Sequence, residues 1–299
     1  MGLFDFFKGK KDNTGQKIKS VPDEKETVEK ILKEIYEETA AECVKIQLTE
    51  TEPSIFESKL GGLAYIPHDG NFPVDSKGNQ LRLLAQIECE KVKHPLYPKQ
   101  GLLQFWFIND EHYGADFDDG LTQNRFRIVY YSNIDETVTE DEIKSKLVQN
   151  EYEKNEDGGC SPLYGEYGMT FTKEQTYMSD NDERFGEIFC KKYNSIYHKN
   201  PIKSYLDCNV DFDEIECYGK ASENAFGHKI GGYPGFTQYD PRDTDDSHDF
   251  LLFQLDSDFD GGNDYKVMWG DAGIANFFIN SEKLKKCDFT DVLYNWDCC

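Results

Sequence analysis

The stretch Leu83-Leu84-Ala85-Gln86-Ile87 returns later in the chain as Leu251-Leu252-Phe253-Gln254-Leu255. Each stretch follows a Gly-Gly pair, in Ser58-Lys59-Leu60-Gly61-Gly62 and in His228-Lys229-Ile230-Gly231-Gly232. Each also precedes an apolar run that opens with glycine, at 101–108 and at 273–279. Motifs that recur in a fixed order are typical of repeats, so these segments predict an internal duplication.

Short apolar stretches separated by Gly, Pro, Asn and Asp clusters are typical of strands. They predict strands at 44–48, 81–89, 101–108 and 126–131 in the first copy. The second set runs from about 219 to the end of the chain. We therefore expect an α+β fold, dominated by β-structure, with duplicated β units, an N-terminal amphipathic helix and helical insertions.

Helical spacing of apolar residues after Pro22 predicts the N-terminal helix, with a stripe that runs from Val28 to Cys43. Thr139 followed by Glu142 predicts the capping box of a second helix. A third helix is predicted over about 182–193. The expected organisation is a basic tail over 1–21 and a single domain over 22–299. That domain contains two β repeats, about 44–135 and 219–299, joined by a connecting segment over 136–218.

The charge balance favours some partners over others. The chain has 57 acids and 33 bases among 299 residues, a net charge of −24. Nucleic acid is a poor partner for such a chain, because phosphate binding needs a basic face. Solubility is the simpler interpretation of the acidity, and attraction to a basic protein partner is the other. An odd number of cysteines, nine, with no secretory signal before them predicts reduced thiols in a cytoplasm.

The N-terminal tail differs from the acidic remainder. It carries five lysines against Asp5 and Asp12 within residues 1–20. Residues 1–11 combine phenylalanines with lysines, which would suit weak peripheral contact with an anionic membrane. A loose tail is the simpler interpretation. No apolar run approaches the length of a membrane span, so we expect no transmembrane segment.

Two acidic turns could bind cations. Asp256, Asp258 and Asp260 resemble the front of a calcium loop, but Val267 stands where the bidentate acid is needed. A polar hairpin turn explains that segment without a metal. The turn 116–120 contains three aspartates and could bind a cation or form a negative patch for a basic partner. A solvated loop is the alternative.

A pocket could form where the two repeats meet, because seams between similar units are common ligand sites. The polar candidates for its lining are Gln86, Gln254, His228 and Asp271. No sequence signature of a nucleophile, phosphate loop or catalytic metal supports an enzyme, so we assign no catalytic residue and no cofactor beyond the calcium hypothesis. The Gly-Gly pairs lack the further glycines of a phosphate loop and are predicted to be structural turns.

The repeat motifs, the segment Trp269-Gly270-Asp271-Ala272-Gly273-Ile274 and the ending Tyr294-Asn295-Trp296-Asp297-Cys298-Cys299 resemble the bacterial YwqG-like family. That is a domain family of unknown function. The resemblance implies a cytoplasmic bacterial protein with a mainly β, roll-like fold, and it supplies no reaction, cofactor or catalytic residue. It also implies relatives encoded near toxin and immunity genes.

The function that the sequence favours is a non-catalytic binding or regulatory protein. An immunity-like protein that binds a basic protein partner would fit this class. The alternative is a small-molecule-binding protein or enzyme with a pocket between the two repeats. The duplication also makes a structural prediction: Phe105 and Phe277, and likewise Leu84 and Leu252, should be buried together, because equivalent positions in duplicated strands face the same side.

Overall fold

The computed structural model describes residues 23–154, 159–242, 247–258 and 265–299. Its strands form a ten-stranded sheet in the order β10-β9-β8-β7-β1-β6-β2-β3-β4-β5, with antiparallel neighbours. The strands are β1 Ala41–Thr49, β2 Lys59–Leu60, β3 Arg82–Glu88, β4 Leu102–Phe107, β5 Phe126–Tyr131, β6 Tyr167–Thr176, β7 Lys229–Gly231, β8 Phe250–Asp256, β9 Ile274–Ile279 and β10 Val292–Asp297.

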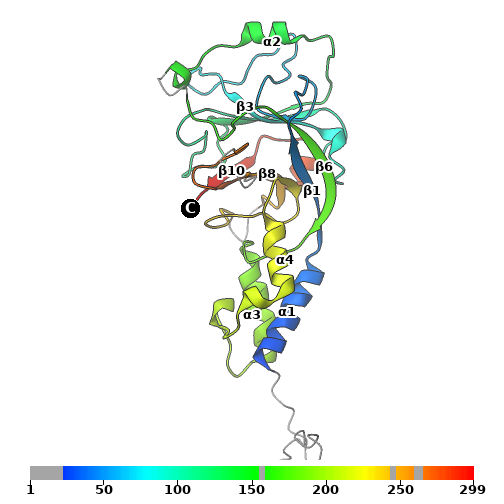
Figure 1. Ribbon diagram of the computed structural model, residues 1–299, viewed down its shortest axis with the longest axis vertical. Helices are drawn as coiled ribbons and strands as arrows, with labels where there is room; N and C mark the ends of the chain where they lie inside the picture. The colour runs from blue at the N-terminus through cyan, green and yellow to red at the C-terminus, as the bar shows by residue number, and fades with distance from the viewer. Residues whose placement is uncertain (1–22, 155–158, 243–246, 259–264) are drawn as a thin grey trace, which may run out of the picture.

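The sheet curls into a nearly closed, barrel-like shape. Strands β1 and β6 are long and run along one side of the body, between two stacked halves of the sheet (Figure 1). We call β2–β5 the first unit and β7–β10 the second unit. The two outermost strands approach each other, since the rings of Phe126 on β5 and Tyr294 on β10 are 5.1 Å apart.

The two units pair their strands in the same way. The β3–β4 ladder has an irregularity between Leu83 and Ala85, and the β8–β9 ladder has one between Leu251 and Phe253. Next to each irregularity a buried polar pair faces across the ladder. It is Gln86 with Gln104 in the first unit, and Gln254 with Asn276 in the second. The fold is thus dominated by β-structure, as the sequence predicted, and the order of strands is mirrored about β1 and β6.

The main core lies between the facing units. The ring of Phe105 is 4.8 Å from that of Phe253 and 5.0 Å from that of Phe277. The predicted burial is confirmed, because Phe105, Phe277, Leu84 and Leu252 are all at most 1% exposed. Aromatic rings at these separations add a geometric preference to the burial of apolar area. The seam between the units is therefore packed with side chains at this point.

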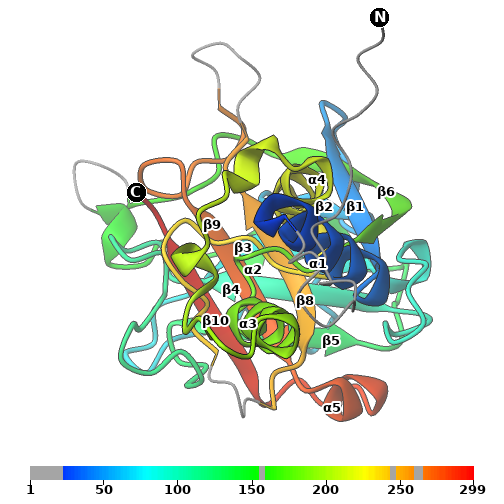
Figure 2. The same ribbon diagram turned by 90° about the horizontal axis from the view of Figure 1, so that it is seen from below.

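The helices lie outside the sheet. Their bounds are α1 Glu24–Glu38, α2 Glu140–Lys146, α3 Arg184–Ile196, α4 Glu216–Ala225 and α5 Ser281–Lys285, with short 3-10 helices η1 Cys89–Lys91, η2 Tyr152–Lys154, η3 Tyr205–Asp207 and η4 Phe212–Glu214. Helices α1, α3 and α4 form a projection below the β body (Figures 1 and 2). The opposite end of the molecule carries α2 (Figure 1). No helix among the described residues is long and apolar enough to cross a membrane.

Local chemistry fixes where two of these helices begin and end. Thr139 accepts a hydrogen bond from the Glu142 amide and begins α2, as the capping signal predicted. The N-terminal helix is shorter than its apolar spacing predicted. It ends at Glu38, and Cys43 lies on β1, where it pairs with β6 and β7. Strand pairing on both sides overrides helical periodicity over this segment, because it satisfies the backbone of a buried strand.

Candidate functional site

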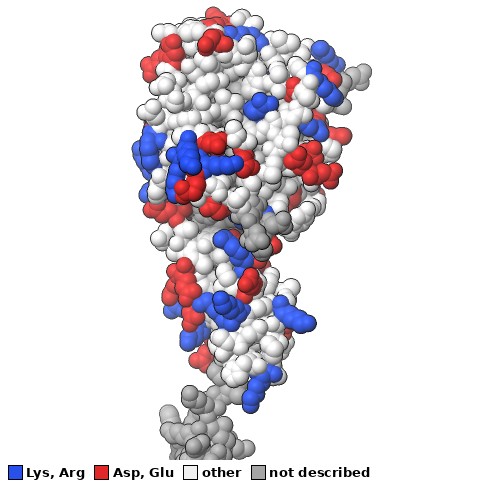
Figure 3. All heavy atoms as spheres, turned by 180° about the vertical axis from the view of Figure 1, so that it is seen from behind, with Lys and Arg blue, Asp and Glu red and all other residues white. Residues whose placement is uncertain are grey.

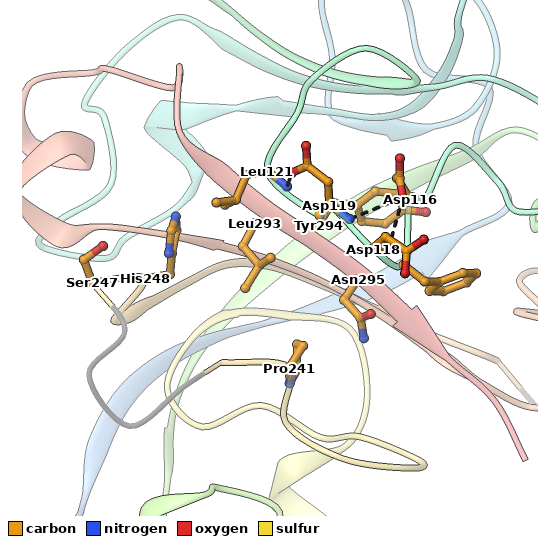
Figure 4. A pocket seen from close by; sticks show the side chains of 12 residues that line it. Asp116, Asp118, Asp119, Leu121, Pro241, Ser247, His248, Leu293, Tyr294 and Asn295 are labelled. Carbon is orange, nitrogen blue, oxygen red and sulfur yellow. Dashed lines mark hydrogen bonds between the residues drawn. The ribbon is translucent and has the colours of Figure 1, made fainter.

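A hollow lined by described residues lies between the two units. Its volume is about 580 Å³. The first unit contributes residues 116–121, which we call the acidic loop, and the second contributes Pro241, Ser247, His248 and part of β10. In Figure 4, β10 carries Leu293, Tyr294 and Asn295 between the acidic loop and Pro241. We call this cavity the acidic hollow.

The acidic loop is held in shape by its own aspartates. The Asp116 carboxylate accepts hydrogen bonds from the amides of Asp118 and Asp119, at 3.1 and 3.2 Å. Asp119 in turn accepts from the Leu121 amide at 3.1 Å. Short aspartate side chains bind backbone amides two or three residues on, which is why they favour turns. The loop therefore has a defined shape before any partner arrives.

A glycine lets the loop approach β10. The Gly120 carbonyl accepts a hydrogen bond from the Tyr294 amide at 2.9 Å. A Cβ atom on Gly120 would lie 2.8 Å from both the Leu293 side chain and the Tyr294 carbonyl oxygen. The missing side chain thus permits the contact that joins the first unit to the edge of the second.

Charge distinguishes the acidic hollow from the others. Its lining contains Asp116, Asp118 and Asp119 and no lysine or arginine. Three further hollows lined by described residues, of about 480, 360 and 410 Å³, each contain a lysine or arginine beside their acids. The Thr122 hydroxyl lowers the pKa of Asp119 by donating a hydrogen bond to its carboxylate. The hollow therefore presents negative charge at neutral pH.

The remaining wall of the acidic hollow is apolar or neutralised. Phe117 and Leu121 are 58% and 43% exposed, which is high for large apolar side chains. On the other wall the His248 ring lies 3.0 Å from the Asp291 carboxylate. Lys283 also pairs with Asp291 at 2.5 Å and lowers the pKa of that carboxyl group. The hollow thus combines exposed apolar surface with uncompensated carboxylates.

The two predicted glutamines lie elsewhere. Gln86 and Gln254 are fully buried and line none of the four described hollows. The Gln86 amide donates to the carbonyls of Ile55 and Glu57, both at 2.9 Å. Gln254 binds the backbone of its own unit in the same way. Both N–H donors of each buried amide are used on backbone carbonyls, so these side chains hold loops in place and have no N–H left to donate to a ligand.

The other two predicted pocket residues are also apart from the hollow. His228 accepts a hydrogen bond from the Asp256 amide at 3.1 Å and is 9% exposed. Asp271 is exposed in the turn before β9. Gln86, Gln254, His228 and Asp271 thus line none of the four hollows described above.

The predicted calcium residues are described only in part. Asp260 lies outside the described residues. The Asp256 carboxylate accepts a hydrogen bond from the Gly227 amide at 2.7 Å, and burial raises its pKa. The Asp258 carboxylate lies 3.9 Å from the His228 ring. Among the described residues, no group of three or more His, Cys, Asp or Glu side chains is arranged to hold a metal ion.

The two Gly-Gly pairs form structural turns, as predicted. All four glycines have positive φ angles, between 63° and 72°. A Cβ atom on Gly62 would lie 2.1 Å from the Glu166 carboxyl carbon, and one on Gly232 would lie 2.0 Å from a Thr176 methyl group. These close approaches explain why both units need glycine at this position.

Residues 58–298 match the model of a domain of unknown function, DUF1963. The chain belongs to this family. No curated protein matches the chain significantly. The match includes both units of the DUF1963 domain and every described residue of the acidic hollow.

Proposed function

We propose that this DUF1963 domain is a non-catalytic binding protein whose acidic hollow takes a lysine- or arginine-rich segment of a partner protein. One observation carries the proposal: the described lining of the hollow contains three aspartates and no lysine or arginine. An arrangement of one sign of charge in a concave surface attracts and orients an opposite charge.

The apolar part of the hollow suits the same ligand. Lysine and arginine side chains have apolar stems, which pack on apolar surface while their charged ends reach polar groups. Phe117, Leu121 and Leu293 offer that surface beside the carboxylates of Asp116 and Asp118. The exposed Phe117 ring could also contact the cation through its face. A basic peptide segment therefore matches the hollow in both charge and shape.

The finer expectations belong to this proposal. The resemblance to the YwqG-like family supports a cytoplasmic bacterial protein, and an immunity-like role against a basic toxin would use such a hollow. The shared strand pairing of the two units supports an origin by internal duplication. Contact of residues 1–11 with a membrane stays a prediction, because those residues lie outside the described part of the chain.

The alternative is a small-molecule-binding protein or enzyme. One observation favours it, since the acidic hollow lies between the two units, where the sequence predicted a pocket. The His248–Asp291 pair at its wall adds a titratable group. The ligand would then be a small organic cation, such as a polyamine, that meets the same carboxylates.

The test uses the purified full chain and a fluorescent oligolysine peptide. We expect saturable binding that weakens with salt, because the contacts are electrostatic. Replacing Asp116, Asp118 and Asp119 by Asn keeps an acceptor oxygen for the loop amides and removes three charges. This triple variant should bind about tenfold more weakly, since exposed charge pairs contribute about 0.2–1 kcal/mol each.

A matched control removes charge elsewhere. Glu140→Gln, Asp141→Asn and Glu282→Gln remove the same number of carboxylates on α2 and α5 and should leave the affinity unchanged. If both triple variants lose the same affinity for oligolysine, the effect depends on net charge alone and the acidic hollow is not the binding site. Tighter binding of spermidine than of oligolysine, lost in the hollow variant, would favour the small-molecule alternative.

A further inference from the structure

A group of aromatic rings borders the acidic hollow. Phe117, which lies in the acidic loop and lines the hollow, contacts the ring of His112 and the ring of Trp296 on β10, each at 5.7 Å between centroids. The Trp296 ring in turn lies 5.1 Å from that of Tyr113. We call these four residues the aromatic cluster. It joins the loop between β4 and β5 to the edge strand of the second unit.

Hydrogen bonds hold the aromatic cluster in place. The Trp296 indole N–H donates to the His112 carbonyl at 2.8 Å, and the Tyr294 hydroxyl donates to the Tyr113 carbonyl at 2.9 Å. A surface that is already ordered loses less conformational entropy on binding than a mobile one. Phe117 nevertheless stays 58% exposed, so much of its ring is open to a ligand.

No cation of the described part of the chain covers this ring. Lysine and arginine side chains lie over other aromatic rings, and none of them lies over Phe117 or Trp296. Arg242, which follows Pro241 of the hollow in the chain, shows the geometry of such a contact, because its guanidinium lies 4.4 Å from the centroid of the Phe278 ring. The charge of Arg242 is compensated by Asp240 at 2.7 Å.

Carboxylates flank the open ring. Asp116 and Asp118 are the neighbours of Phe117 in the chain, and both are exposed. Asp116 binds the loop amides through Oδ1 alone, and the Asp118 carboxylate accepts no hydrogen bond within the described residues. Both carboxylates are therefore available to a cation that lies on the Phe117 ring.

Charge on another face of the molecule is arranged differently. Seen from behind, Lys and Arg side chains lie beside Asp and Glu side chains over both the β body and the helical projection (Figure 3). A basic segment on that face would meet like charges as well as opposite ones. The acidic hollow instead combines carboxylates with an open aromatic ring and contains no lysine or arginine in its described lining.

We infer that the aromatic cluster is a subsite for an arginine side chain, so that the acidic hollow selects arginine over lysine in the basic segment. This inference rests on the proposed function. A guanidinium is planar and weakly hydrated, so it stacks on an aromatic face while its N–H groups reach carboxylates. The lysine ammonium is compact and strongly hydrated, and it gains less from the ring. A quaternary ammonium prefers a cage of rings, whereas Phe117 and Trp296 contact each other and leave no space between them.

The experiment measures, by anisotropy, the affinity of the full chain for fluorescent hexaarginine and hexalysine peptides, which carry equal charge. The parent protein should bind hexaarginine about fivefold more tightly, because the guanidinium adds a contact with the ring. Phe117→Leu keeps an apolar side chain and removes the ring, so it should lower this preference about threefold. Phe117→Tyr restores an aromatic face and should keep the preference of the parent protein.

The matched control is Phe226→Leu, which removes a partly exposed ring at the end of α4, outside the hollow, and should leave the preference unchanged. Both Phe117 variants should melt at the temperature of the parent protein, because the ring is largely exposed. Equal affinity of the parent protein for the two peptides would overturn the inference and leave the proposed function intact. A preference for hexaarginine that Phe117→Leu does not lower would do the same. Binding of neither peptide would refute the proposed function itself.

Discussion

In both units of the sheet, a buried glutamine at an equivalent position holds the backbone around the Gly-Gly turn. In the first unit, the Gln86 amide binds the backbone on both sides of the Gly-Gly turn that follows Ser58. In the second, Gln254 does the same around the turn that follows His228. Ser58 and His228 themselves accept hydrogen bonds from backbone amides of β3 and β8. These shared contacts are the ones that hold each unit together.

The units differ in the partners of their buried lysines and in the charge of their surface loops. Lys59 pairs with Glu166 at 2.7 Å, whereas Lys229 binds only carbonyls at the end of α4. The loop after β3 is basic, and the loop after β8 is acidic. The acidic loop over 116–121 belongs to the first unit alone. Backbone-binding side chains therefore occupy equivalent places in both units, whereas the charge of the surface loops differs between them.

The largest expected effect is on the shared core. Phe105→Ala and Phe277→Ala should each reduce the free energy of unfolding by about 3–5 kcal/mol, because both rings are buried and leave a cavity. Urea unfolding followed by tryptophan fluorescence measures both values. A cost below about 1 kcal/mol for one variant, with the expected cost for the other, would break the equivalence of the units.

The next largest effect is a difference in the free energy of unfolding between variants of the two buried lysines, Lys59 and Lys229. Lys59→Met removes the partner of Glu166 and the donor to two carbonyls, and should cost about 2–4 kcal/mol. Lys229→Met should cost less than about 1.5 kcal/mol, because the Ala225 carbonyl keeps a hydrogen bond from Gln254. The same urea measurement at neutral pH compares them. Equal losses of unfolding free energy in the two variants would contradict this prediction, because the acidic partner of Lys59 would then contribute nothing to stability.

The pH dependence of Lys229 sharpens that comparison. Burial lowers its folded pKa well below 10.5, so between the folded and unfolded pKa values the unfolded chain binds more protons. The stability contributed at this site therefore rises with pH through that window. Relative to Lys229→Met, the parent protein should gain stability from about pH 7 to about pH 9.5. A difference that stays constant with pH would contradict the lowered pKa.

The smallest expected effect concerns calcium. If Asp256, Asp258 and Asp260 bind the ion, calcium equal to its dissociation constant adds only about 0.4 kcal/mol of stability. The melting temperature should rise with millimolar calcium in the parent protein and not in Asp258→Asn. Magnesium serves as the control, because it demands a tighter octahedral site. No rise with calcium would remove this hypothesis.

Sequence reasoning predicted the strands of the first copy and the core because both leave local patterns, but it missed β6, which lies in the predicted connecting segment over 136–218. Apolar runs and their repetition predicted that Phe105 and Phe277 would be buried, and the aspartates of the acidic loop were visible as a turn. The sequence suggested a pocket between the repeats but did not predict which residues line it. Its other wall comes from β10 and His248, which meet the loop only because the curled sheet brings its two edges together.

The glutamines show a second limit. A polar residue within an apolar strand can either line a cavity or bind backbone groups. The sequence pattern is the same in both cases and does not distinguish them. The alternative hypothesis from the sequence named Gln86 and Gln254 as candidates for the lining of a pocket, and the structure places their amides on loop backbone. The early end of α1 has a related cause, since Cys43 obeys helical spacing but pairs within the sheet. Long-range contacts decided each of these outcomes.

The most direct test of the binding account is a charge swap at the acidic hollow. Asp118 is exposed there, and its carboxylate is not needed to shape the loop, so Asp118→Lys should fold normally. Anisotropy would measure both proteins against oligolysine and against the same peptide with one lysine changed to glutamate. The account predicts that Asp118→Lys binds the glutamate-containing peptide more tightly than the sum of the two single changes would give. The coupling energy should be about 0.5 kcal/mol or more. A coupling energy of zero would contradict binding of the basic segment in the hollow.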